Sequence, residues 1–161
     1  KNRFNSPICE ADLIDGKYVV DPKILRKRNF SLVLTNGCFD ILHSAHIELL
    51  KFAKSQGDKL VLALNTDSSI SRIKANRPIV PFADRLKVMS GLEFVDFIVS
   101  FEEDTPLKLI QEIQPDVLVK GSEYEEKNIV GYGIVPKIIT FPMLPGKSTT
   151  SIIKKIQGEK T

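Results

Sequence analysis

Short apolar runs alternate with amphipathic segments along most of this chain, and this alternation limits its fold more than any other feature of the sequence. Residues 32–34 predict a buried strand, and the dipeptide Asn36-Gly37 predicts a turn directly after it. A helix is expected next, because apolar residues recur at helical spacing until Gly57. These apolar residues are Ala45, Leu49, Phe52 and Ala53.

The same alternation continues to the end of the chain. Further strands are predicted at residues 60–64, 95–100, 117–119 and 138–141, and further helices at residues 83–92, 106–113 and 148–156. Strands that alternate with helices form a parallel sheet with helices on both faces, so the predicted fold class is α/β and Rossmann-like. Ligands bind such sheets beyond the carboxyl ends of the strands. We therefore expect four connecting segments to converge there, at residues 35–46, 65–78, 120–124 and 143–150.

The composition fits one folded domain in a chain of 161 residues. With 23 basic and 20 acidic residues the net charge is only +3, so no nucleic-acid partner is expected. The longest purely apolar run, residues 60–64, is far shorter than the roughly 20 residues of a membrane helix, so no membrane partner is expected. Cys9 and Cys38 form no CxxC pair, and the polar residues 1–29 contain no signal sequence, which favours a cytoplasmic location.

Two glycine-containing segments look like phosphate-binding motifs but lack an essential residue. Residues 146–148 read Gly-Lys-Ser, yet Phe141 stands where a P-loop requires glycine. Residues 131–133 read Gly-Tyr-Gly, yet Pro136 stands at the third glycine position of a dinucleotide-binding fingerprint. Both motifs are therefore excluded, and the second segment is interpreted as a loop.

The strongest chemical signal lies in residues 35–46, TNGCFDILHSAH, which hold both histidines of the chain. The spacing of His43 and His46 at a helix start puts both imidazoles on one face, beside free backbone N–H groups and the positive end of the helix dipole. Gly37 is expected to let the backbone turn closely over a bound anion. This arrangement predicts a polyphosphate site in which the imidazoles stabilise charge on phosphorus. A zinc site that includes Cys38 and a purely structural role are the alternatives.

The segment GCFDILHSAH resembles the GxFDxxHxGH signature of the cytidylyltransferase-like nucleotidyltransferases. The resemblance extends over residues 31–157, and within the superfamily it is strongest to the bacterial D-glycero-β-D-manno-heptose 1-phosphate adenylyltransferases. It implies a nucleotidyltransferase domain at residues 30–161, preceded by a lead-in segment at residues 1–29. The other matching stretches are Asn65-Thr66-Asp67, Arg77-Pro78-Ile79, Val95-Asp96, residues 100–106, residues 115–121 and Ser148-Thr149-Thr150.

The resemblance implies roles for individual residues. His43, His46 and Lys74 are expected to be catalytic, and Asp40 is expected close to the phosphates and to Mg²⁺, which accompanies ATP. Lys74 belongs to a basic stretch with Arg72 and Arg77, for which a solvated loop is the alternative. The expected nucleotide-binding residues are Asn36, Gly37, Cys38, Phe39, Asp40, His43, His46, Arg85, Lys120, Gly121, Glu123, Ser148, Thr149 and Thr150, of which the last three can equally be plain helix-capping residues.

Two positions bear on activity and on the choice of nucleotide. Ala45 replaces the signature glycine before His46, and its methyl group is expected to narrow the space for a phosphate at the helix start. The glycerol-phosphate cytidylyltransferases carry an arginine at the head of RTxGISTT, where this chain has Met143. Methionine cannot donate the hydrogen bonds of arginine, so ATP is favoured over CTP.

The resemblance therefore implies an adenylyltransferase that converts ATP and a sugar 1-phosphate, with D-glycero-D-manno-heptose 1-phosphate as the expected acceptor, into an ADP-sugar and pyrophosphate. One alternative is a CTP-dependent enzyme that acts on glycerol phosphate or an amino-alcohol phosphate. Another is a nucleotide-binding domain that has lost catalysis through Ala45. Homologous domains often pair as homodimers, and they are joined to a kinase domain or follow a separate kinase; both are expectations here.

Overall fold

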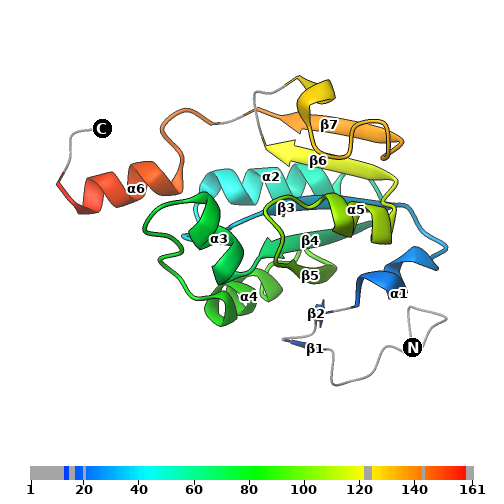
Figure 1. Cartoon of the computed structure of the whole chain (residues 1–161), viewed down its shortest axis with the longest axis horizontal. Helices are drawn as coiled ribbons and strands as arrows, with labels where there is room; N and C mark the ends of the chain where they lie inside the picture. Colours follow the sequence, from blue (N-terminus) through cyan, green and yellow to red (C-terminus); the bar gives the residue numbers. More distant parts are fainter. Residues whose placement is uncertain (1–12, 15–16, 20, 122–124, 143, 159–161) are drawn as a thin grey trace.

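A seven-stranded sheet forms the centre of the computed structural model, which describes residues 13–14, 17–19, 21–121, 125–142 and 144–158 (Figure 1). The strand order is β1-β2-β5-β4-β3-β6-β7. Neighbouring strands are parallel except β1, which runs antiparallel to β2. The strands are β1 Leu13–Ile14, β2 Lys17–Val19, β3 Leu32–Gly37, β4 Lys59–Asn65, β5 Phe97–Phe101, β6 Val117–Gly121 and β7 Lys137–Phe141.

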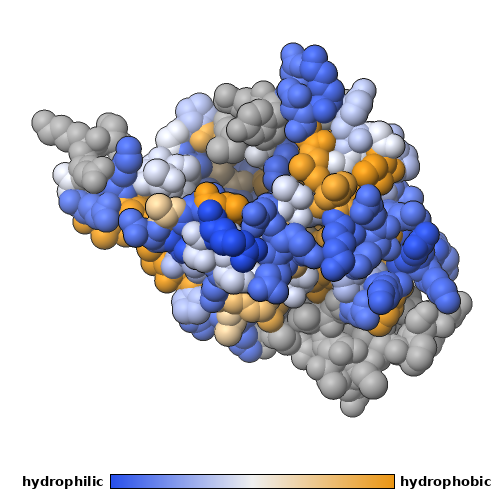
Figure 2. Space-filling view, in the orientation of Figure 1, coloured by the Kyte–Doolittle hydropathy of each residue, from blue (hydrophilic) through white to orange (hydrophobic). Residues whose placement is uncertain are grey.

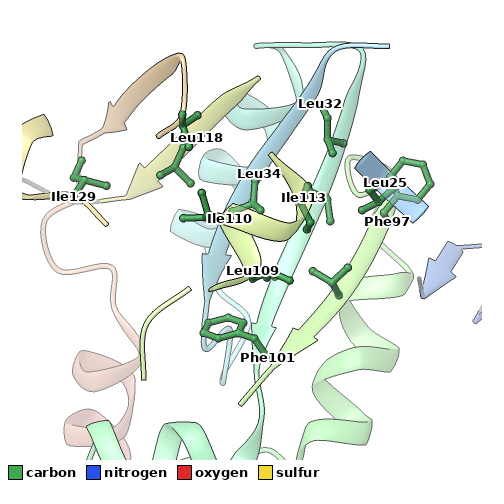
Figure 3. Close-up of a cluster of buried hydrophobic side chains, with 14 residues drawn as sticks. Leu25, Leu32, Leu34, Phe97, Phe101, Leu109, Ile110, Ile113, Leu118 and Ile129 are labelled. Carbon is green, nitrogen blue, oxygen red and sulfur yellow. The ribbon is translucent and has the colours of Figure 1, made fainter. Parts of the chain in front are cut away.

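Helices cover both faces of this sheet, which confirms the predicted α/β class. Buried leucine and isoleucine side chains join α1 and α5 to one face (Figure 3), and α2 and α4 pack on the other through Leu50, Ala53 and Met89. Because β3 and β4 are buried on both faces, their sequences are almost continuously apolar. The helices are α1 Pro22–Arg26, α2 Ser44–Lys54, α3 Asp67–Ile73, α4 Phe82–Ser90, α5 Leu107–Ile113 and α6 Thr149–Ile156, with a 3₁₀ turn η2 at Glu126–Asn128.

The predicted turn at Asn36-Gly37 is wrong, because β3 continues through both residues and Gly37 pairs with Leu64. The chain bends instead at Phe39, whose φ of +45° is uncommon for a residue with a side chain. Glycine is still required at position 37, since a Cβ atom there would lie 2.9 Å from the ring of Phe39. The aromatic ring therefore explains this glycine better than a close approach to an anion does.

Two segments contain more regular structure than the sequence predicts. The segment expected to be a loop at residues 65–78 contains α3, whose first turn is capped by the hydroxyl of Thr66 accepting from the N–H of Ser69 at 3.3 Å. The expected lead-in at residues 1–29 contributes α1, as the helix start predicted at Asp21-Pro22 indicates, and also the unpredicted strands β1 and β2, of which β2 extends the sheet beyond β5.

The strand order reverses next to β3, because β4 and β5 follow on one side while β6 and β7 lie on the other. Parallel α/β sheets form a crevice at such a point, beyond the carboxyl ends of the strands. The loop at residues 38–43 leaves β3 at this position and leads into α2. The topology therefore puts the histidine-containing segment where a ligand site is expected.

Most of the face in Figure 2 is hydrophilic, with hydrophobic side chains gathered over the loop between β6 and β7. That loop includes the exposed residues Val130 and Ile134. Within the part of the chain that the structure describes, no helix has both the length and the apolar character needed to cross a bilayer.

Candidate active site

A cavity of about 330 Å³ lies at the carboxyl ends of β3, β6 and β7. All four connecting segments that were expected to converge contribute described residues to it, so that prediction is confirmed. The loop after β3, the start of α2 and the start of α6 all contribute lining residues. The start of α6 lies beyond the carboxyl ends of β6 and β7 (Figure 1). The lining residues are Asn36, Gly37, Cys38, Phe39, Asp40, His43, Ala45, His46, Leu49, Lys74, Arg77, Lys120, Gly121, Phe141, Pro142, Leu144, Lys147, Ser148, Thr149 and Thr150.

The two imidazoles line this cavity together, as their spacing predicts. His43 is the N-cap residue of α2 and His46 lies in its first turn. Their rings stack with centroids 3.7 Å apart and planes inclined by 23°. The ring of Phe39 lies 4.9 Å from that of His46, so the unusual bend at Phe39 also supports the histidine pair from the side.

Burial fixes the chemical form of both rings. The Nδ1 atoms of His43 and His46 are buried without a hydrogen-bond partner among the described residues. An unpaired acceptor costs less than an unpaired N–H in such a place, so the proton belongs on Nε2, where it can be donated to a ligand. Burial lowers the pKa of His43, and burial together with the charges of His43 and Lys74 lowers the pKa of His46 to about 4 despite Asp40. Both rings are therefore neutral donors at neutral pH.

Three lysines give the cavity its charge. The ammonium group of Lys120 donates to Oδ1 of Asn36 at 3.3 Å, and burial lowers its pKa, with Cys38 opposing and Lys74 adding to the effect. Lys74 and Lys147 have no hydrogen-bond or ion-pair partner through their side chains in the described ranges. Such unpaired cations around a neutral pair of donors are suited to a ligand with several negative charges.

Among the described residues, Asp40 is the one carboxylate that lines the cavity, and its oxygens already accept hydrogen bonds. They accept from the guanidinium of Arg77, from the N–H of Ile79 at 2.9 Å and 3.0 Å, and from the N–H of Val80 at 2.7 Å. Burial raises the pKa of Asp40, but these donors outweigh it and hold the pKa below its ordinary value.

This geometry does not fit a metal ion held by the protein. The carboxylate of Asp40 is fully buried and has no oxygen free for coordination. Among the residues with described positions, no group of three or more His, Cys, Asp or Glu side chains could hold a metal ion. A zinc centre at the two histidines and Cys38 therefore has no support.

Comparison with known proteins agrees with this geometry. The family model for cytidylyltransferase-like proteins matches residues 34–155, which include the cavity segments described above. The chain belongs to the cytidylyltransferase-like family. It is accordingly a nucleotidyltransferase domain, and the matched residues include both histidines.

Curated relatives of this cytidylyltransferase-like domain are longer than the chain itself. It is 50% identical over 134 residues to bifunctional protein HldE of Wolinella succinogenes, covering 83% of this chain and 28% of that protein. It is 51% identical over 136 residues to bifunctional protein HldE of Campylobacter concisus, covering 84% of this chain and 29% of that protein. The chain thus spans less than a third of the length of these relatives.

Solved structures show the same fold for the cytidylyltransferase-like domain. A lipopolysaccharide core biosynthesis protein from Thermoplasma volcanium superposes with a TM-score of 0.61 and 33% identity, covering 70% of this chain and 97% of that one. Pantoate-beta-alanine ligase from Francisella tularensis, complexed with beta-gamma ATP and beta-alanine, gives a TM-score of 0.57 at 16% identity, covering 83% of this chain and 69% of that one. The second likeness concerns the fold alone.

Arg85, a predicted nucleotide contact, does not line the cavity of the cytidylyltransferase-like domain. Its side chain is only 1% exposed. Its guanidinium donates to the carbonyls of Cys38, Asn65 and Val80 at 2.8 Å, 2.9 Å and 3.0 Å, and to the carboxylate of Asp67 at 2.7 Å. In this structure Arg85 therefore joins the loop after β3, the junction of β4 with α3, and the segment before α4.

The other predicted residues differ in where the structure places them. Glu123 and Met143 lie outside the described residues, so the structure does not address their roles. The hydroxyl of Ser148 caps α6 by accepting from the N–H of Ser151 at 3.1 Å, as the capping alternative predicts. Arg72 lies outside the cavity, where it pairs with Asp104 at 2.8 Å. Ser148 and all remaining predicted residues line the cavity.

Sequence reasoning missed Lys147, which lines the cavity, whereas Arg77 lines it as part of the basic stretch that was expected to meet phosphates. Lys147 was set aside with the incomplete P-loop motif. Its place directly before the Ser-Thr-Thr run at the start of α6 is the signal that points to it. Ala45 is the second residue of α2 and also lines the cavity, so the signature substitution does border the site.

Proposed function

We propose that this domain transfers AMP from ATP to a sugar 1-phosphate and releases pyrophosphate. The observation that carries the proposal is the stacked pair His43 and His46 at the start of α2, which opens on a cavity with three lysines. Neutral N–H donors and cations around one cavity match the oxygens and charge of a triphosphate. The cavity volume of about 330 Å³ falls within the usual range for small-molecule sites.

The chemistry requires no nucleophile from the protein. A phosphate oxygen of the sugar 1-phosphate attacks the α-phosphorus of ATP and forms the new P–O bond. The bond from the α-phosphorus to the bridging oxygen of the β-phosphate breaks, and pyrophosphate leaves with that electron pair. The attacking phosphate is already anionic at neutral pH, because its second pKa is about 6, so no general base is needed. Catalysis then consists of alignment and charge stabilisation.

The residues of the cavity supply both effects. The Nε2–H groups of His43 and His46 donate to phosphate oxygens on which negative charge develops. Lys74, Lys120 and Lys147 neutralise the triphosphate and the departing pyrophosphate. A divalent ion such as Mg²⁺ enters as part of the ATP substrate, since Asp40 has no oxygen free to hold one.

The acceptor is inferred from the likeness to other proteins. The resemblance to heptose 1-phosphate adenylyltransferases supports D-glycero-D-manno-heptose 1-phosphate as the acceptor. The 33% sequence identity to a lipopolysaccharide core biosynthesis protein supports it too. Because the relatives are longer and called bifunctional, we infer that a kinase domain or a separate kinase supplies the sugar phosphate. We infer a cytoplasmic location from these proposed substrates. A homodimer stays a prediction.

Pyrophosphate release tests the proposal directly. ATP and CTP are each assayed with heptose 1-phosphate, other hexose 1-phosphates, glycerol 3-phosphate and phosphoethanolamine. We expect turnover with ATP and a sugar 1-phosphate only. Preference for CTP with glycerol phosphate or phosphoethanolamine would assign the domain to the cytidylyltransferase alternative. Tight ATP binding without turnover on any phosphate would assign it to the non-catalytic alternative.

A further inference from the structure

A buried ionic link joins the signature loop to the segment between α3 and α4. Asp40, in the loop that leads to His43, accepts hydrogen bonds from Arg77 and from the N–H groups of Ile79 and Val80. The carboxylate of Asp40 is 0% exposed and the side chain of Arg77 is 9% exposed. A charged pair at this depth is retained only where its geometry and its hydrogen bonds compensate for lost solvation.

The segment at residues 74–80 depends on this link. It begins with Lys74 directly after α3, and residues 71–76 are exposed. Among the described residues, the direct hydrogen bonds between residues 75–80 and the signature loop all go to Asp40. The carbonyl of Val80 accepts from Arg85, which lies in α4. Arg85 also donates to the carbonyl of Cys38 and so ties both segments to one guanidinium.

We infer that Asp40 is a buried anchor rather than a metal ligand, and that Arg77 acts through it as a positioning residue that holds the Lys74 segment against the two imidazoles. Lys74 is otherwise a cation on an exposed stretch, and the link fixes where that stretch runs relative to His43. Displacement of a phosphate-binding group by about 1 Å can cost on the order of a hundredfold in rate. The inference rests on the proposed function for its kinetic consequence, but not for its structural one.

Amide hydrogen exchange tests the structural part without any substrate. The N–H groups of Ile79 and Val80 have Asp40 as their acceptor, so Asp40→Asn and Arg77→Gln are expected to speed their exchange at least about tenfold. Arg77→Lys keeps the charge and is expected to restore part of the protection. Arg72→Gln, which breaks an exposed ion pair outside the cavity, serves as the matched control and leaves exchange unchanged. Exchange of both amides at the wild-type rate in Asp40→Asn and Arg77→Gln would overturn the anchor.

Binding of Mn²⁺, followed by electron paramagnetic resonance, tests the metal part. A buried anchor predicts equal Mn²⁺ affinity for the wild type and Asp40→Asn, both without nucleotide and with ATP. A metal ligand predicts weaker Mn²⁺ binding in Asp40→Asn while the Ile79 and Val80 amides stay protected, which would overturn the inference. If Asp40→Asn does not fold, exchange of the Ile79 and Val80 amides in Arg77→Gln tests the anchor independently.

Steady-state kinetics test the positioning role. Asp40→Asn and Arg77→Gln are each expected to lower kcat by on the order of a hundredfold, with a smaller change in KM for ATP. The double variant is expected to be no worse than either single variant, because both break the same link. Losses that multiply in the double variant would show that Arg77 acts on the substrate directly. Absence of turnover in the wild type would remove the proposed function, whereas exchange and Mn²⁺ binding would still decide the anchor.

Discussion

The two ends of the sheet use similar charged groups in opposite ways. At the amino ends of the strands, Asp58, Asp96 and Asp116 accept from backbone N–H groups at or just before the start of β3 and β4, and Asp96 also pairs with Lys54 and Lys59. At the carboxyl ends, the side chains of Lys74 and Lys147 lack a described partner, and Nδ1 of both imidazoles is buried without one. The three aspartates at the amino ends have partners within the protein, whereas these four groups at the carboxyl ends have no described partner.

The difference separates groups that stabilise the fold from groups that serve the reaction. A carboxylate that accepts from backbone and lysine contributes to the unfolding free energy whether or not substrate is present. Cations that line one cavity with two partly buried imidazoles are expected to lower that free energy until a polyphosphate binds. The comparison predicts that substitutions at the two ends change different quantities.

The largest effect is expected at the histidines. His43→Ala and His46→Ala are each expected to lower kcat by about 10²–10³-fold, because a donor to the reacting phosphate is lost. Their effect on the KM for the sugar phosphate should be much smaller. Steady-state pyrophosphate release checks this, with Glu48→Ala on the exposed side of α2 as control. Wild-type kcat in either histidine variant would contradict the assignment of that ring.

Asp96→Ala is expected to give the opposite pattern at the amino ends of the strands. It should lower the free energy of unfolding by about 2–4 kcal/mol, because Lys54, Lys59 and the N–H of Leu60 lose their acceptor. The kcat of the folded protein should not change. Urea denaturation measures the loss, and Asp104→Ala, which breaks an exposed pair with Arg72, is expected to cost at most about 0.5 kcal/mol. A large fall in the kcat of Asp96→Ala would contradict the prediction that the two ends of the sheet affect different quantities.

Lys120→Met tests the comparison at the carboxyl ends of the strands. Burial and Lys74 both disfavour the charged ammonium of Lys120, so its removal is expected to raise the unfolding free energy by about 1 kcal/mol. Loss of one cation should weaken ATP binding about tenfold at the same time. Denaturation and calorimetric titration measure the two changes, with the exposed Lys154→Met as control. Lower stability of Lys120→Met would mean that its bond to Asn36 outweighs the cost of burial.

Acidification is expected to destabilise the ligand-free protein through His46. Its pKa in the folded chain is about 4, lowered from the ordinary value of 6.5 by burial first. As the pH falls below 6.5 the unfolded chain takes up a proton that the folded chain resists until about pH 4, so stability falls across this window. The expected loss at pH 5 is about 1 kcal/mol after allowance for solvent screening. Thermal denaturation at pH 7 and pH 5 should show a smaller shift for His46→Gln; equal shifts would contradict the argument.

The sequence predicted the fold because the strongest patterns belong to its centre. β3 and β4 each contain an uninterrupted apolar run, residues 32–34 and 60–64, and α2 repeats apolar residues at helical spacing. α3 was missed because a helix of seven residues with Ser69 and Ile70 as its buried positions has too little periodicity to detect. β1 and β2 are two and three residues long, and such strands form through their neighbours in the sheet rather than through local preference.

The site was predictable where its residues lie close together in sequence. His43 and His46 are three positions apart, and their shared helix face follows from that spacing. The partners of Arg85 and Asp40 come from separate segments of the chain; Arg85, for example, donates to both Cys38 and Asn65. Only folding brings such segments together. A basic side chain in a sequence does not reveal whether it will meet a phosphate or a backbone carbonyl.

The reversal of strand order beside β3 has a consequence for how substrate choice can diversify. The segments that follow β3, β4 and β7 all reach one crevice, yet each leaves a different strand of the same sheet. An exchange of one such segment is expected to alter the lining of the cavity while the hydrogen-bonded strands stay intact. Chimaeras made by grafting the turn before α6 offer a modular route to new acceptors on an unchanged framework.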